Sequence, residues 1–319
     1  MSVDKLFANA SANTILAPMA GYTDFAFRSI CRQYGVGLTV TEMVSSKALT
    51  MDNQLSKQML YRKDNDTPCF CQIFGHEPSV MADSVQLPEV AAYEGVDINM
   101  GCPVKKIVRN GDGSALLETP KLASQCIAAV KRAIGDKPLS VKFRLGVSDS
   151  NHAVDFAKMC RDSGADFITV HFRTRTQMYA GNADYTLLSK LAKVGLPLFA
   201  NGDVATRQQY IQLLERGAYG VAIGRGALGR PYVFAEVANQ PYELNLYDTV
   251  NRHANMLLKV FGDRVVANEL KKHVSAYLRG KRNGKLTIVA VNASHTVKEI
   301  LDLVAEFIAA NPQFEKVTQ

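Results

Sequence analysis

Short β-rich runs recur along the chain as far as about residue 240, and stretches with helical spacing separate most of them. Strands that alternate with helices favour a parallel sheet covered by helices, and eight of them in this length match a closed (β/α)8 barrel. An open doubly wound sheet is the alternative, but no G-x-G-x-x-G motif follows the first run. We therefore predict an α/β fold built on a TIM barrel. The runs are TILAPM (14–19), LTVTEM (38–43), CFCQIFG (69–75), VDINMG (96–101), LSVKFRLG (139–146), FITVHFR (167–173), LFANGD (198–203) and VAIGRG (221–226).

The pattern changes after about residue 240, where apolar residues recur at helical spacing and β-rich runs cease. We predict two domains, a barrel over residues 1–240 and a small C-terminal all-helical domain over residues 241–319. The apolar residues at helical spacing are Leu270, Val274 and Leu278, followed by Val297, Ile300, Leu301, Val304 and Ile308.

The cysteines and the apolar segments exclude several classes of protein. Six cysteines are scattered without a C-x-x-C pair or an H-x-x-x-H partner, so neither a disulfide framework nor a zinc site is indicated, and no metal is expected. The N-terminus lacks the pattern of a signal peptide, and no apolar run reaches the length that spans a membrane. We expect a cytoplasmic protein that does not contact a membrane.

The chain carries a formal net charge of +7, which permits a polyanionic partner. The stretch KKHVSAYLRGKRNGK (271–285) contains six of the basic residues and no carboxylate. Such a stretch is either a solvated face or a surface that binds a polyanion, and the residues alone leave both possibilities open. The basic residues are Lys271, Lys272, Arg279, Lys281, Arg282 and Lys285.

Polar side chains follow or end six of the predicted strands. In a TIM barrel these ends meet at one face, where the chemistry is built. One such residue would mean little, but convergence from six strands predicts a site at this face. The residues are Gln72, Asn99 and Cys102, Lys142 and Arg144, His171 and Arg173, Asn201 and Asp203, and Arg225.

The last two predicted strands lead into segments suited to phosphate. NGD (201–203) and GRGALGRP (224–231) supply small residues and exposed backbone N–H groups, and Arg225 adds a charge-assisted bond. A phosphate there would place a flavin ring near Gln72, Lys142 and the APM segment (17–19). A lysine suits the flavin edge that gains negative charge on reduction, so we predict bound FMN.

Cys102 has three possible roles in this setting, as a metal ligand, a nucleophile or a proton donor. No partner ligands fit a metal, and nothing near it in the sequence assures the low pKa that a nucleophile needs. A thiol with a pKa of about 8.5 is mostly protonated at neutral pH and can act as a general acid. Together with hydride from a reduced flavin, this proton would complete the reduction of a C=C bond.

Several ordered motifs together resemble the tRNA-dihydrouridine synthases, and the likeness is greatest to the bacterial B-type branch. They cover residues 14 to about 235, and KHVSAYLRG (272–280) resembles the start of that family's helical domain. The motifs are APMAGYTD (17–24), DINMGCPVKK (97–106), GSALL (113–117), VKFRLG (141–146), HFRTRTQMYAG (171–181), NGDV (201–204) and GRGALGRP (224–231).

The resemblance implies an FMN enzyme, recharged by NADPH, that reduces the C5–C6 bond of specific uridines in the D-loop of tRNA. By this resemblance Cys102 is the acid that protonates C5, and Asn99 lies near the target base. The residues that resemble cofactor contacts are Pro18, Met19, Gln72, Lys142, His171, Asn201, Asp203, Gly224 and Arg225.

A uridine in folded tRNA must be extruded to reach such a site, and contacts to phosphate would offset the cost of unstacking. We expect these contacts from Lys105, Lys106 and Arg109, and from Lys271, Lys272, Arg279, Lys281 and Arg282 in the C-terminal domain; Arg173 and Arg175 face the RNA or the flavin site. We expect a monomer without an obligate protein partner.

Two other functions remain as alternatives. A small-molecule flavoprotein of the dihydroorotate-dehydrogenase kind would share the barrel and FMN, but it does not explain the basic helical domain. An RNA-binding protein without catalysis would not need Cys102, Lys142 and NGD. The chain also departs from the family at Phe172, where a small residue is usual, and at Tyr232, where tryptophan is frequent.

Overall fold

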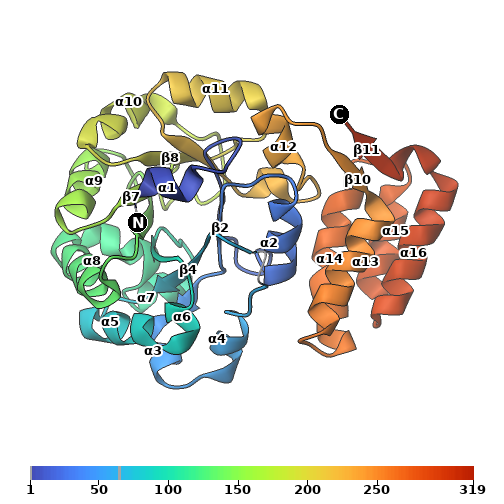
Figure 1. Cartoon of the computed structure of the whole chain (residues 1–319), viewed down its shortest axis with the longest axis horizontal. Coiled ribbons are helices and arrows are strands. Elements are labelled where there is room, and N and C mark those ends of the chain that lie inside the picture. Colours follow the sequence, from blue (N-terminus) through green and yellow to red (C-terminus); the bar gives the residue numbers. More distant parts are fainter. Residues whose placement is uncertain (1, 64–65) are drawn as a thin grey trace.

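The computed structural model describes residues 2–63 and 66–319, and Figure 1 shows a barrel with a group of helices beside it. Within these residues, eight parallel strands close into a ring, because β2 pairs with both β1 and β4. Each contains part of one predicted β-rich run, so the TIM barrel is confirmed. The strands are β1 (Thr14–Leu16), β2 (Leu38–Val40), β4 (Cys69–Phe74), β5 (Gly95–Met100), β6 (Leu139–Arg144), β7 (Phe167–His171), β8 (Leu198–Asn201) and β9 (Gly220–Ile223), with β3 (Val44–Ser45) added beside β4.

Helices form the outer layer of the barrel and most of the group beside it (Figure 1). The α-helices are α1 (Val3–Phe7), α2 (Phe25–Arg32), α3 (Ser46–Thr50), α4 (Gln54–Gln58), α5 (Pro78–Gln86), α6 (Pro88–Ala91), α7 (Lys105–Arg109), α8 (Pro120–Ile134), α9 (Ala153–Asp162), α10 (Leu188–Leu191), α11 (Arg207–Glu215), α12 (Val233–Ala238), α13 (Leu246–Leu258), α14 (Asp263–Leu278), α15 (Gly284–Ala293) and α16 (Val297–Ala310). The 3-10 turns are η1 (Gly113–Glu118), η2 (Tyr185–Leu187), η3 (Ala192–Val194), η4 (Arg225–Ala227) and η5 (Pro312–Phe314).

Local sequence explains where several helices begin. Asp24 accepts hydrogen bonds from the N–H groups of Ala26 and Phe27 and so caps α2. Helices α11 and α16 each begin with a capping box, in which Thr206 or Thr296 exchanges hydrogen bonds with the residue three positions later. These caps satisfy N–H groups that have no partner inside the helix.

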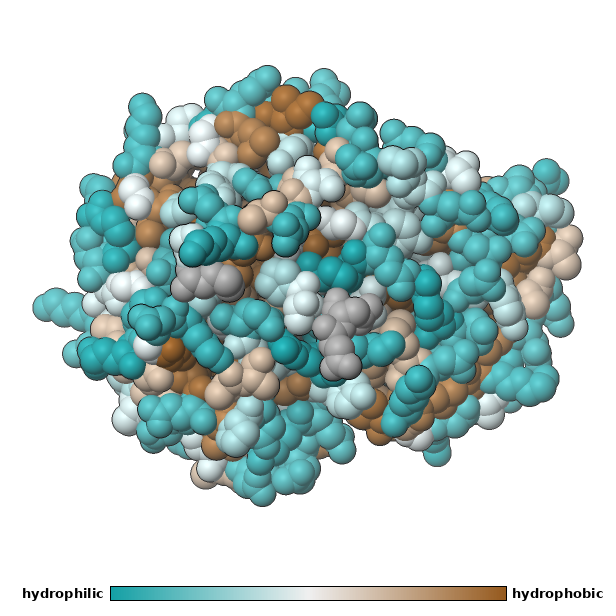
Figure 2. Space-filling model, in the orientation of Figure 1, coloured by the Kyte–Doolittle hydropathy of each residue, from teal (hydrophilic) through white to brown (hydrophobic). Residues whose placement is uncertain are grey.

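Aromatic side chains fill the barrel core at the N-terminal end of the strands. A cluster that includes Phe7, Phe70, Phe167 and Phe199 closes the N-terminal end of the strands, and α1 lies across it. Figure 1 views the molecule from this end, and Figure 2 shows that hydrophilic side chains dominate its surface, with apolar ones in separate small areas. Inside the barrel, the phenylalanine cluster leaves the opposite end, where the strands finish, to carry polar side chains.

The C-terminal helices α13 to α16 pack against one another and against the barrel through α2. Asp24 lies 3.3 Å from Nε2 of His253 on α13 and 3.4 Å from Nε2 of His273 on α14. The loop after β9 also reaches α14: a Cβ on Gly229 would lie only 2.4 Å from the carbonyl oxygen of Ala276. The absence of a side chain at Gly229 thus allows this loop to touch the helical group.

A two-stranded antiparallel ribbon was not expected from the sequence. It consists of β10 (Glu243–Asn245) and β11 (Lys316–Thr318), and it ties the start of the helical group to its end. Among the described residues, no helix is both long enough and apolar enough to cross a membrane.

Candidate active site

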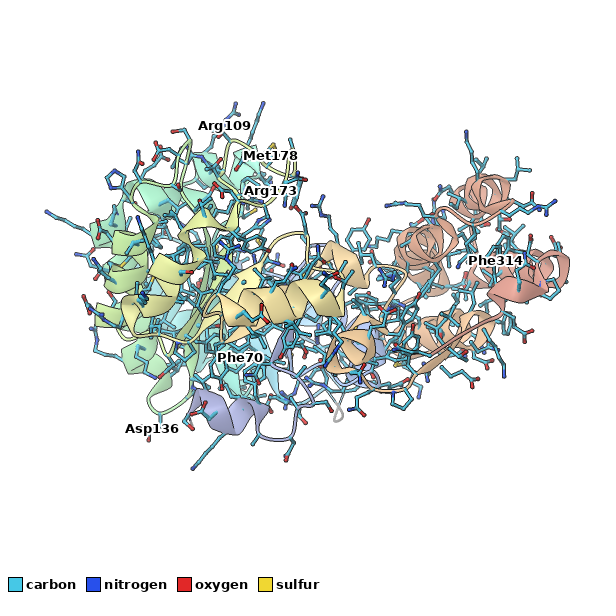
Figure 3. The ribbon with its side chains drawn as sticks, turned by 90° about the horizontal axis from the view of Figure 1, so that it is seen from above. Phe70, Arg109, Asp136, Arg173, Met178 and Phe314 are labelled. Carbon is cyan, nitrogen blue, oxygen red and sulfur yellow. The ribbon has the colours of Figure 1, made fainter. Side chains whose placement is uncertain are left out.

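The predicted site residues collect at the C-terminal end of the barrel. Figure 3 shows Arg109, Arg173 and Met178 at this end of the molecule and Asp136 at the other. Strand register brings the inner residues together, since Asn99 pairs with Lys142 and His171 pairs with both Arg144 and Asn201. The closed sheet therefore converts positions far apart in sequence into one ring of polar side chains.

A chain of hydrogen bonds runs beneath this ring from β6 to the loop after β5. Ser140 donates to Asp97 Oδ1 at 2.5 Å, and Gln72 Nε2 donates to Asp97 Oδ2 at 2.6 Å. Asn99 Nδ2 then donates to Gln72 Oε1 at 3.0 Å. Sequence reasoning included Gln72 and Asn99 but missed Asp97. The available signal was a carboxylate inside a strand of otherwise buried, mainly apolar character.

The loop that carries Cys102 is held from both sides. Asn99 Oδ1 accepts the backbone N–H groups of Gly101 and Cys102 at 3.1 and 2.9 Å, and Ser114 Oγ donates to the carbonyl oxygen of Cys102 at 2.8 Å. Gly113 lies directly against the cysteine, because a Cβ there would be 3.1 Å from that of Cys102. The GSALL motif thus packs behind the cysteine loop.

Burial raises the pKa of the half-buried Cys102 thiol above its usual range. The thiol therefore stays protonated at neutral pH. The other five cysteines, all among the described residues, are buried. Cys102 is thus the cysteine with access to the surface.

Lys142 and Asp97 form the charged centre of the site. Burial, followed by the nearby Arg144, lowers the pKa of Lys142 to about 8. Burial raises the pKa of Asp97 to about 6, although Gln72, Ser140 and Lys142 act in the opposite direction. Both groups are consequently mostly charged at neutral pH.

His171 is neutral in this environment. Burial and then the positive charge of Lys142 lower the pKa of His171 to about 2. Arg173 Nη1 lies 3.4 Å from His171 Nε2, and because arginine only donates, the ring hydrogen belongs on Nδ1. Phe172, the departure from the family pattern, is buried with its ring centroid 4.5 Å from that of Tyr185.

Arg173 and Arg175 do not present free guanidinium groups to the outside. Arg173 is 2% exposed and donates to the carbonyl oxygens of Ala180 and Gly181 and to Asp203. Arg175 pairs with Glu118 at 2.5 Å. Both were expected to face the RNA or the flavin site. In the structure, Arg173 holds the loop after β7 from within, because its carbonyl and carboxylate partners surround it.

That loop places Tyr179 between two arginines. Its ring centroid lies 5.5 Å from the guanidinium carbon of Arg144 and 5.3 Å from that of Arg225. Arg144 also donates to the carbonyl oxygens of Thr174 and Met178, which anchors the loop. Tyr179 is 57% exposed and was not singled out from the sequence. It offers an aromatic face next to the ring of polar side chains.

The ends of β8 and β9 form a polar cradle. Asn201 Nδ2 donates to the carbonyl oxygen of Ala222 at 2.7 Å, and Asp203 pairs with Arg225 at 3.0 Å. Among the described residues, no protein acceptor pairs with the backbone N–H groups of Gly224 and Arg225. A Cβ on Gly224 would lie 3.4 Å from Met19 Sδ, so the segment that follows β1, which includes Pro18, borders the same cradle.

The predicted RNA-binding lysines and arginines occupy two separate surfaces. Lys105, Lys106 and Arg109 are exposed on α7, next to the cysteine loop. In the helical group, Arg279 and Arg282 are exposed, and Lys281 lies 4.7 Å from the Phe314 ring centroid. Lys271 donates a hydrogen bond to Asn268, and Lys272 forms an ion pair with Glu269. The ammonium groups of Lys271 and Lys272 therefore already have partners within the protein.

Comparison with known proteins identifies the family. Residues 15–311 match the model described as dihydrouridine synthase (Dus). "Probable tRNA-dihydrouridine synthase" of Rickettsia conorii is 33% identical over 322 residues, covering 97% of both chains. tRNA-dihydrouridine synthase B of Pseudomonas putida is 35% identical over 285 residues, covering 86% of this chain and 84% of the relative. Morphinone reductase shares the fold, with a TM-score of 0.51 and 9% identity over 70% of this chain and 84% of the other. The chain belongs to the dihydrouridine synthase family.

Proposed function

We propose that this enzyme reduces the C5–C6 double bond of uridines in the D-loop of tRNA, with FMN as bound cofactor, NADPH as reductant and Cys102 as proton donor. The observation that carries the proposal is a partly exposed thiol, Cys102, on a loop that Asn99 and Ser114 hold from both sides beside Lys142. Family membership supports the reaction class and the tRNA substrate.

The cradle fits the phosphate of FMN. In the part of the chain that the structure describes, the N–H groups of Gly224 and Arg225 have no protein acceptor, and the Arg225 side chain is 53% exposed. Phosphate oxygens accept such donors, particularly at the start of a helical turn. The ammonium group of Lys142 has no hydrogen-bond partner among the described residues, so it would be available to the ring edge that becomes negative.

The cradle and Lys142 would hold FMN, which when bound and reduced would supply the hydride for C6 of the uracil ring. Cys102 holds the proton that C5 must receive, and its raised pKa keeps that proton on sulfur until it is transferred to C5. Asn99 fixes the cysteine backbone and retains one amide hydrogen for a uracil carbonyl. Neutral His171 cannot compete with Cys102 as an acid at neutral pH.

The remaining surfaces suit a polyanion whose base has been extruded. Tyr179 offers a stacking face at the mouth, and stacking on an aromatic ring is worth about 1–3 kcal/mol per base. Lys105, Lys106 and Arg109 border the same mouth and would bind phosphate. We assign residues 1–240 to catalysis and residues 241–319 to tRNA binding, and we infer a monomer in the cytoplasm.

The test separates the two half-reactions. Cys102→Ala should retain FMN and be reduced by NADPH at an unchanged rate, measured by the loss of flavin absorbance in stopped flow. Its reoxidation by tRNA lacking dihydrouridine should slow by about 10²- to 10⁴-fold, the usual contribution of a general acid. Nucleoside mass spectrometry of the wild-type product should show two added hydrogens at particular D-loop uridines. Unchanged reoxidation in the variant would exclude the acid role, and flavin turnover without modified tRNA would favour a small-molecule reductase.

A further inference from the structure

Resting on the proposed function, we propose that Asp97 is a positioning residue: through Gln72 it orients the Asn99 amide, and Asn99 in turn holds the backbone of Cys102. Asp97 is 2% exposed and lies on β5 two residues before Asn99, below the ring of site residues. It contacts neither the cradle nor the thiol, so it acts through the residues between.

The Asp97 carboxylate, at one end of the hydrogen-bond chain, determines the direction in which Gln72 and Asn99 donate. Ionised Asp97 can only accept hydrogen bonds, so Gln72 must turn its NH2 group toward it, at 2.6 Å. Burial raises the pKa of Asp97 to about 6, which still leaves it mostly ionised at neutral pH. With the NH2 group committed, Gln72 presents its oxygen to Asn99, which donates at 3.0 Å.

The backbone N–H groups at the other end of the hydrogen-bond chain require the same direction of donation. Backbone N–H groups can only donate, so Asn99 must turn its oxygen toward Gly101 and Cys102. Its NH2 group then faces Gln72 and keeps one hydrogen for another acceptor. The buried acceptor and the two backbone donors thus leave a single arrangement of both amides, which makes the Cys102 loop part of the rigid strand layer.

Loss of Asp97 removes the acceptor that orients Gln72. Asp97→Ala leaves a buried NH2 group without a partner, and Gln72 can rotate to find another. Asn99 then loses its defined partner, and the thiol is no longer held at its reacting distance. A misplacement of about 1 Å can cost about 10²-fold in rate.

The conservative variant should restore the arrangement. Asp97→Asn can accept from Gln72 with its oxygen while its NH2 group donates to Ser140 Oγ. Ser140→Ala is the matched control, because it removes the other hydrogen bond of Asp97 and leaves the chain to Cys102 intact.

Two measurements test the proposal. First, tRNA-driven flavin reoxidation, assayed at neutral pH where Asp97 and Lys142 of the wild type are both mostly charged, should slow by about 10- to 100-fold in Asp97→Ala. It should remain within about threefold of wild type in Asp97→Asn and Ser140→Ala, with NADPH-driven reduction unchanged in all three. Second, iodoacetamide should alkylate Cys102 faster in the flavin-free Asp97→Ala protein than in wild type. Cys102→Ala gives the background, because the other cysteines are buried.

The second measurement needs neither tRNA nor flavin, so it tests the positioning role even if the proposed reaction is absent. If Asp97→Ala fails to fold, Gln72→Met breaks the same chain one step nearer the loop and should give the same fast alkylation. Wild-type alkylation in these variants would overturn the proposal. Equal loss of reoxidation in Asp97→Ala and Asp97→Asn would also overturn it, since charge rather than hydrogen-bond direction would then be responsible.

Discussion

The buried ion pair between Arg28 and Asp66 should respond strongly to the single substitution Asp66→Asn. Both side chains are 0% exposed, and Arg28 Nε lies 2.7 Å from Asp66 Oδ2. Arg28 also donates to the carbonyl oxygens of Thr23 at 2.8 Å and Tyr61 at 3.1 Å. Among the described residues, the guanidinium group therefore has one formal counter-charge and two dipolar acceptors.

The expected cost follows from that arrangement. Asparagine can keep the hydrogen bond to Arg28 and one to Thr39 Oγ1, which now donates to Asp66 at 2.6 Å. The loss is then mainly the charge attraction, about 4 kcal/mol for two charges about 4 Å apart at an effective dielectric constant of about 20. Breaking a buried pair commonly costs about 3–5 kcal/mol, so we expect the free energy of unfolding to fall by about 3–4 kcal/mol.

Urea titrations followed by circular dichroism would measure this change. Arg28→Met should cost a similar amount, because it leaves the Asp66 carboxylate buried without its partner. The double variant Arg28→Met/Asp66→Leu should be more stable than the sum of the single changes predicts, because no unpaired charge remains. A loss below about 1 kcal/mol for Asp66→Asn, or full additivity in the double variant, would refute this reasoning.

Two further predictions concern pH and salt. Burial lowers the pKa of His273 from 6.5 to about 4. Between these pH values the unfolded chain binds a proton that the folded chain does not. The free energy of unfolding should therefore be at its full value above about pH 6.5 and fall by about 3 kcal/mol as the pH decreases to about 4. Urea midpoints across this range should show the slope, and His273→Phe should flatten it; an unaltered slope would assign it to other groups. Separately, Arg279→Ala and Arg282→Ala should each reduce the salt dependence of tRNA binding by about one counterion, measured by filter binding, whereas Lys193→Ala, just before β8 at the opposite end of the barrel, should not. Equal effects of all three substitutions would indicate that the helical group is not part of the RNA interface.

The barrel could be predicted from the sequence because each strand is marked locally by its own β-rich run. The ribbon of β10 and β11 could not, because its short strands lie about 70 residues apart and neither has a strong pattern. Pairing of that kind depends on how α13 to α16 fold back between them.

The site was predicted where residue type and strand end coincide, as at Gln72, Asn99 and Cys102. Asp97 was missed because its role depends on Gln72 from the neighbouring strand, and no spacing within one strand reveals such a partner. The inward orientation of the Arg173 side chain could not be predicted from the sequence either, because it depends on Asp203, which lies 30 residues away and accepts its hydrogen bond.

The partial burial of Cys102 has a consequence for survival under oxidative stress. The thiolate form of a cysteine attacks peroxides and other electrophiles, and a raised pKa keeps that form scarce. The environment that would keep the proton on Cys102 in the proposed reaction should therefore also slow formation of sulfenic acid at this partly exposed cysteine. Cys102 would then keep its thiol through many catalytic cycles, while burial shields the other five cysteines.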